Sequence, residues 1–117
     1  MASAKTTPAS VMSKSLRKSP TAKELQRHTG AAADLLKALA NEQRLSILCG
    51  LLDGPRSVGQ INASVNLSQS ALSQHLAVLR EGGLVETEKE AQTVYYSVPE
   101  GPVHKILEAL KEIYCAR

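Results

Sequence analysis

The fold is decided by residues 57–98, which read SVGQINASVNLSQSALSQHLAVLREGGLVETEKEAQTVYYSV. A short helix is expected to start at Ser57 and to end before a tight turn at Val65-Asn66-Leu67. Ser68 has the position of the N-cap of a second helix, which ends at Gly82-Gly83. The inner face of this second helix consists of Leu72, Leu76 and Leu79. Two short helices joined by a tight turn predict a helix-turn-helix.

The hydrophobic period then changes from helical to alternating. Residues 84–88 and 93–98 read as two short strands around a loop at 89–92. A hairpin directly after a helix-turn-helix is expected to form a wing.

Three further helices are expected around this unit. Thr21 and Glu24 have the spacing of a capping box for one helix that runs to Leu39, and Asn41 caps a second helix. A last helix is predicted from about residue 103 to residue 114, with a wide apolar stripe. The fold class predicted is mainly α with a small β-hairpin: four helices, the hairpin and a final helix, forming one winged helix-turn-helix domain over residues 21–117.

The amino-acid composition excludes several classes of function. The 117 residues are 43% hydrophobic and contain three Tyr but no Trp or Phe, which argues against an RNA-binding sheet with stacked aromatic residues. No apolar run is long enough to span a bilayer, and the first 20 residues lack the apolar core of a secretory signal. Two cysteines do not make a disulfide framework, so a cytoplasmic protein with reduced thiols and no membrane contact is expected.

The net charge of +3 is unevenly distributed. Residues 1–20 contain four basic groups and no acidic group, and they are rich in Ser, Thr, Pro and Ala. This composition predicts a disordered basic tail. The tail is either a solvated leader or a weak electrostatic arm for an anionic polymer.

The outward face of the second helix of the helix-turn-helix is small and polar, which lets a helix enter a major groove about 12 Å wide. Gln side chains can pair with adenine edges, and the helix N-terminus can hold a phosphate near Ser68. The expected contacts with double-stranded DNA are Ser68, Gln69, Ser70, Ser73, Gln74 and His75. The wing is short of cations, since Lys89 stands among Glu86, Glu88 and Glu90.

Residues 39–48, residues 67–85 and the pair Tyr95-Tyr96 together resemble the ArsR family of winged-helix repressors. The resemblance implies a homodimer formed by the first and last helices, with interface residues Leu25, Ile106, Leu110, Ile113 and Tyr114. It also implies an operator with two half-sites, and release from DNA when an inducer binds. The acidic wing departs from the more basic family pattern, so Lys89 and Thr93 are kept as weak wing contacts.

Many members of this family sense metals. One family site uses Cys-x-Cys at the start of the third helix, where this chain has Ser57-Val58-Gly59. Another uses paired carboxylates and His residues on the last helix, where only His104 is present with Glu100 and Glu108. No metal site and no cofactor are therefore expected.

The two cysteines remain. Cys49 shares an apolar stripe and is predicted to be partly or wholly buried, whereas Cys115 ends the last helix four residues after Lys111, whose charge favours a thiolate. Without the family resemblance, the residues are equally consistent with two free cysteines that have no special function. The resemblance extends to the BigR/SqrR/HlyU subgroup, which implies that Cys49 and Cys115 form a redox pair responsive to persulfides and related reactive sulfur species.

Three alternatives remain to be weighed. The first is a metal-responsive repressor that uses Cys49, Cys115 and His104. The second is a thiol oxidoreductase, which would need a Cys-x-x-Cys or an activated Cys-His pair that the chain lacks, so an enzyme is not expected. The third is a winged-helix adaptor that binds protein, supported only by the acidic wing.

Overall fold

The computed structural model describes residues 21–115, so the prediction of a disordered tail at 1–20 lies outside the described residues. The chain divides into two compact units, Met1–Leu36 and Lys37–Arg117. Among the described residues, no helix has the length and apolar character needed to cross a membrane.

The first unit contains α2 (Ala22–Gln26) and most of α3 (Thr29–Leu39). The capping box predicted at Thr21 is confirmed, because the Glu24 amide donates to the Thr21 hydroxyl oxygen at 3.1 Å and the Thr21 amide donates to the Glu24 carboxylate at 3.4 Å. The prediction of one continuous helix is wrong. Hydrogen bonds that span three residues, and not four, end α2. The His28 amide donates to the Leu25 carbonyl at 2.8 Å, and the Thr29 hydroxyl donates to the Gln26 carbonyl at 3.2 Å.

The second unit begins with three helices, α4 (Glu42–Leu51), α5 (Val58–Ser64) and α6 (Gln69–Glu81), and α4 packs against both others. Each starts at the polar residue that the sequence predicts: Asn41, Ser57 and Ser68 accept backbone N–H bonds as N-caps. Such caps satisfy amides that have no partner inside the helix. These boundaries follow from interactions over three residues, which explains why the sequence alone predicts them.

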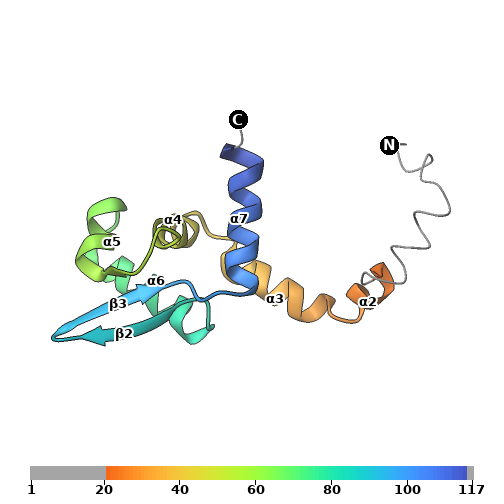
Figure 1. Cartoon of the computed structure of the whole chain (residues 1–117), viewed down its shortest axis with the longest axis horizontal. Helices are drawn as coiled ribbons and strands as arrows, with labels where there is room; N and C mark the ends of the chain where they lie inside the picture. The colour runs from red at the N-terminus through yellow and green to blue at the C-terminus, as the bar shows by residue number, and fades with distance from the viewer. Residues whose placement is uncertain (1–20, 116–117) are drawn as a thin grey trace. The chain divides into compact units, whose positions relative to one another are not determined.

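The second unit also contains a three-stranded antiparallel sheet of order β1-β3-β2. Its two longer strands, β2 and β3, are labelled in Figure 1. The hairpin strands are β2 (Glu86–Glu90) and β3 (Thr93–Ser97), which confirms the predicted hairpin with its first strand starting two residues later. Ala91 has φ of 56° in the turn between them. The strand that the sequence analysis missed is β1 (Arg56–Ser57), which pairs with β3.

The core of the second unit is aliphatic. Leu72, Leu76 and Leu79 of α6 are at most 2% exposed, as predicted. They share the interior with residues from the other elements: Leu39, Ile47, Leu48, Leu51, Ile61, Leu84, Val85, Val103 and Leu107. Leu84 and Val85 are buried in the segment before β2, so they anchor the wing to the helices.

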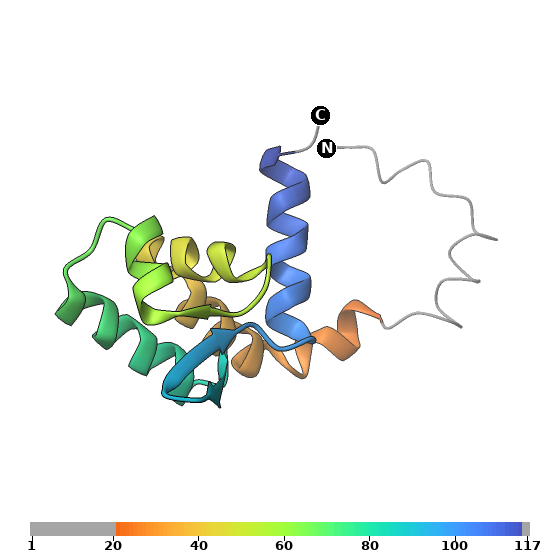
Figure 2. The same ribbon diagram turned by 60° about the vertical axis from the view of Figure 1, so that its left-hand side comes forward.

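The last helix, α7 (Pro102–Cys115), is buried at its start and exposed at its end. Val103 and Leu107 enter the core, whereas Ile113 is 67% and Tyr114 80% exposed. Figures 1 and 2 both show the C-terminal half of α7 extending away from the helix-turn-helix and the sheet. This half of α7 presents apolar side chains to solvent, which is unusual for a stable surface.

Candidate DNA-binding surface and cysteine pair

The turn between α5 and α6 is fixed by side-chain bonds to the backbone. The Asn62 side-chain amide donates to the Leu67 carbonyl at 3.0 Å, immediately before the N-cap of α6. The Ser64 hydroxyl donates to the Ile61 carbonyl at 3.0 Å and closes the end of α5. Sequence analysis did not single out Asn62, although an Asn inside a short helix before a turn is a signal of such a bond. These contacts tie the end of α5 and the residue before the α6 N-cap to the turn between the two helices.

The outward face of α6 matches the prediction from the sequence. Ser68, Gln69, Ser70, Ser73 and Gln74 are exposed, and His75 is half-buried beside them. The Ser68 hydroxyl oxygen accepts from the Ala71 amide at 3.2 Å and lies 3.4 Å from the Ser70 hydroxyl. The first turn of α6 therefore presents hydroxyl groups and N–H groups together, an arrangement that suits phosphate and base edges.

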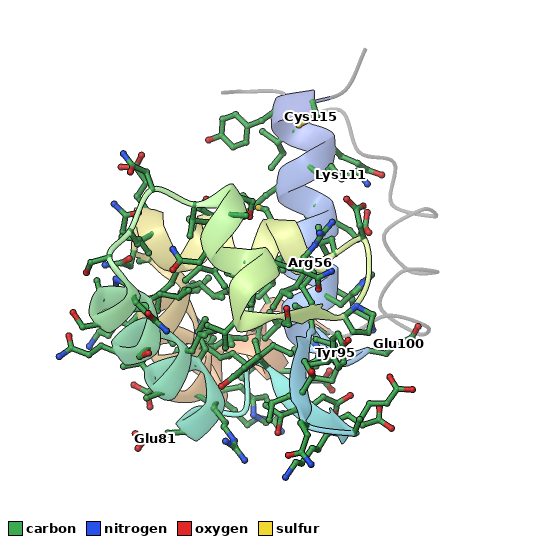
Figure 3. The ribbon with its side chains drawn as sticks, turned by 90° about the vertical axis from the view of Figure 1, so that its left-hand side faces the viewer. Arg56, Glu81, Tyr95, Glu100, Lys111 and Cys115 are labelled. Carbon is green, nitrogen blue, oxygen red and sulfur yellow. The ribbon has the colours of Figure 1, made fainter. Side chains whose placement is uncertain are left out.

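A hollow of about 290 Å³ lies between α6 and β3. Its walls are formed by Val58, Ser73, Leu76, Ala77, Arg80, Glu81 and Tyr96. Ser73 thus lies where the outward face of α6 meets the groove beside the wing. Figure 3 shows Glu81 at the opposite end of α6 from the turn, where its carboxylate disfavours a phosphate.

The two faces of the wing differ in charge. Side chains alternate along a strand, and the register pairs Glu88 with Tyr95 and Glu90 with Thr93. Thr93 therefore shares its face with the carboxylates of Glu86, Glu88 and Glu90. Lys89 pairs with Val94 on the other face, the one that includes Tyr96 and faces α6. The two wing residues predicted as DNA contacts are exposed but lie on opposite faces, and Lys89 has the more favourable surroundings for DNA.

The sequence predicts that Cys49 is partly or wholly buried, and whole burial is wrong, since both cysteines are free and exposed. The buried face of α4 is formed by Ile47, Leu48 and Leu51, which rotates Cys49 out of the core. Partial burial still raises the pKa of the Cys49 thiol, and negative charge on the sulfur of Cys115 raises this pKa further. The two cysteines are 66 positions apart in sequence, and the charge of one affects the pKa of the other.

Polar contacts near Cys115 run along the exposed side of α7. The Glu108 carboxylate lies 4.0 Å from His104 Nε2 through one oxygen and 4.0 Å from Lys111 Nζ through the other. Figure 3 shows Lys111 one turn below Cys115 on the same helix. Within residues 21–115, no group of three His, Cys, Asp or Glu side chains gathers in a way that could hold a metal ion.

The domain of residues 41–87 matches the family model described as "Bacterial regulatory protein, arsR family". The transcriptional activator HlyU of Vibrio cholerae is 53% identical over 92 residues, which cover 79% of this chain and 85% of that protein. The chain belongs to the ArsR family. The resemblance inferred from residues 39–48, 67–85 and 95–96 is confirmed.

Solved structures place this ArsR protein in the BigR/HlyU-like subgroup. Reduced HlyU from Vibrio cholerae superimposes with a TM-score of 0.73 at 53% identity, covering 80% of this chain and 98% of the other. The transcriptional repressor BigR from Xylella fastidiosa superimposes with a TM-score of 0.77 at 35% identity, covering 84% and 100%. The predicted winged helix-turn-helix is thereby confirmed. This ArsR protein is a DNA-binding transcriptional regulator and not an enzyme, because its relatives are transcriptional regulators.

Proposed function

We propose that this ArsR protein binds operator DNA as a homodimer and releases it when Cys49 and Cys115 are joined by a sulfur bridge. The observations that support the proposal are the two free, exposed thiols on α4 and α7 and the effect of Cys115 on the pKa of Cys49. The inducer is a persulfide or a related reactive sulfur species. In this way the concentration of reactive sulfur species around the protein controls transcription.

The bridging chemistry follows from the difference between the two thiols. The raised pKa of Cys49 lowers its thiolate fraction near neutral pH, so Cys115 attacks first. The Cys115 thiolate bonds to the outer sulfur of a persulfide R–S–SH, the donor S–S bond breaks, and the donor leaves as RSH after taking a proton. The product is Cys115–S–SH.

Cys49 then closes the bridge. Its sulfur attacks the Cys115 sulfur that is attached to Cβ, and the outer sulfur leaves as H₂S, which carries the persulfide proton and the proton lost by the Cys49 thiol. The two protein thiols lose two electrons, and the transferred sulfur is reduced to sulfide. When Cys49 has taken a sulfur atom from a second donor, the same displacement leaves a trisulfide and one H₂S. A direct disulfide requires Cα atoms within about 7 Å, and an added sulfur atom relaxes that limit.

The bridge acts on DNA binding through α4. This helix packs against α5 and α6, so tying it to α7 joins the support of the DNA-reading helix to the helix proposed for dimerisation. In the bridged dimer the two α6 helices have a spacing that does not match the two operator half-sites, and the affinity for operator DNA therefore falls. The proposed operator contacts are the exposed residues of α6 with His75, Lys89 and Thr93, and the proposed dimer contacts are Leu25, Ile106, Leu110, Ile113 and Tyr114.

The test combines intact-mass spectrometry with operator titration before and after treatment with a persulfide such as glutathione persulfide. Wild-type protein should show an intramolecular bridge and weaker operator binding, and a reducing thiol should reverse both changes. Cys49→Ser and Cys115→Ser should bind the operator normally and show no response. Release of DNA by persulfide-treated Cys49→Ser would refute the intramolecular bridge. Equal operator affinity before and after complete bridging would exclude the cysteines as the switch.

A metal-responsive mechanism is tested by the same titration. Addition of Zn²⁺ to the reduced protein is expected to leave operator affinity unchanged. Nothing in the described residues favours this alternative, because the Cys pair lacks a third ligand and His104 lies near Glu108.

A further inference from the structure

Arg56 stands where three parts of the second unit meet. Its backbone belongs to β1 and pairs with Tyr96 of β3, in the sheet that forms the wing. The next residue, Ser57, is the N-cap of α5, the first helix of the helix-turn-helix. Its half-buried side chain extends in a third direction, toward α4.

The Arg56 side chain holds the end of α4. Its Nε donates to the Gly50 carbonyl at 2.9 Å. Gly50 is in the last turn of α4, whose carbonyls have no partner within the helix, and a cation at that end is favoured by the helix dipole. Among the described residues Arg56 forms no ion pair, so this charge-assisted bond is what fixes the guanidinium.

Gly50 is the neighbour of Cys49 and lies beside the end of α5, at a distance that would leave room for a Cβ. A Cβ placed on Gly50 would lie 4.0 Å from the Ser64 hydroxyl. A displacement of Cys49 therefore moves a backbone segment that lies beside the end of α5 and accepts a hydrogen bond from the side chain of Arg56 in β1. Figure 3 shows Arg56 near α4, with Tyr95 on the adjacent strand.

We propose that Arg56 is the positioning residue that transmits the state of Cys49 to the wing and to the start of α5. Bridging of Cys49 shifts the last turn of α4, the Gly50 carbonyl moves relative to the guanidinium, and β1 with its partner β3 changes position against α6. This inference rests on the proposed function, because the input is the sulfur bridge at Cys49. The described geometry connects Arg56 to α4, to β3 and to the start of α5.

The experiment compares the ratio of operator affinities, reduced over bridged, among variants of the full chain. Arg56→Gln removes the bond to Gly50 and is expected to lower the ratio by about fivefold or more, within the usual range of coupling between sites. Arg56→Lys keeps the charge near the helix end but lacks Nε, and it should give an intermediate ratio. Mass spectrometry confirms that each variant forms the bridge to the same extent.

Arg44→Gln is the matched control. Arg44 Nε donates to the Ala38 carbonyl at 2.8 Å, also six residues earlier and also half-buried, but this bond involves no strand of the sheet. Arg44→Gln should lose similar stability in thermal unfolding and retain the wild-type ratio. A wild-type ratio in Arg56→Gln, or an equal loss of the ratio in Arg44→Gln, would overturn the inference.

Hydrogen exchange separates failure of this inference from failure of the proposed function. Bridging should raise amide exchange at residues 56–57 and 95–97 in wild-type protein and leave it unchanged in Arg56→Gln. A wild-type protein that bridges without losing operator affinity refutes the proposed switch. A wild-type protein that loses affinity with unchanged exchange in the β1–β3 pair refutes the role of Arg56 alone.

Discussion

Substitution of Ile113 tests whether the exposed end of α7 forms the dimer interface. Ile113 is 67% exposed, and full burial of an Ile side chain is worth about 1.5–3 kcal/mol. Covering its exposed part therefore contributes about 1–2 kcal/mol in each protomer. A two-fold interface contains the residue twice, so Ile113→Ser should weaken dimerisation by about 2–4 kcal/mol. Because about 1.4 kcal/mol corresponds to a tenfold change, the dissociation constant should rise by roughly 30-fold to 1000-fold.

Sedimentation equilibrium over a wide concentration range measures this change. The control is Val78→Ser, which removes another β-branched side chain that is 45% exposed but lies on α6. Val78→Ser should dimerise like the wild type. An unchanged dissociation constant in Ile113→Ser, or a monomeric wild-type protein at micromolar concentration, would refute the assignment of this surface to dimerisation.

Three further predictions concern DNA reading, the cap of α6 and pH. Ser73→Ala and Gln74→Ala should each weaken operator binding by about 1–3 kcal/mol while leaving binding to random DNA unchanged; fluorescence anisotropy with both DNAs measures this, and unchanged discrimination would place the readout elsewhere. Ser68→Ala removes the oxygen that accepts from the Ala71 amide and should cost about 1 kcal/mol in urea unfolding, whereas Ser68→Asp should retain the stability. The rate of bridge closure should continue to rise at pH values above the range in which an ordinary thiol ionises, because the raised pKa of Cys49 shifts formation of its thiolate to higher pH. Stopped-flow mixing of preformed Cys115 persulfide at several pH values tests this prediction. A rate that is independent of pH would contradict it.

The sequence by itself determined the helix-turn-helix and its boundaries. Ser57, Ser68 and Asn41 cap helices through bonds that span three residues, and Leu72, Leu76 and Leu79 repeat at the helical period. Such local interactions depend on the order of residues and little on the rest of the fold. Residues 39–48 and 67–85, which contain the caps Asn41 and Ser68, also carry the resemblance to the ArsR family.

Two features depend on the tertiary structure alone: the exposure of Cys49, and the position of Arg56 in a strand that pairs with β3. The sequence pattern places Cys49 on the apolar stripe of α4, whereas packing against α5 and α6 buries Ile47, Leu48 and Leu51 and leaves Cys49 outside. A strand of two residues has no period to detect, so β1 appears only when β3 lies beside it. The effect of Cys115 on the pKa of Cys49 likewise involves positions far apart in the chain, and such an effect depends on long-range packing.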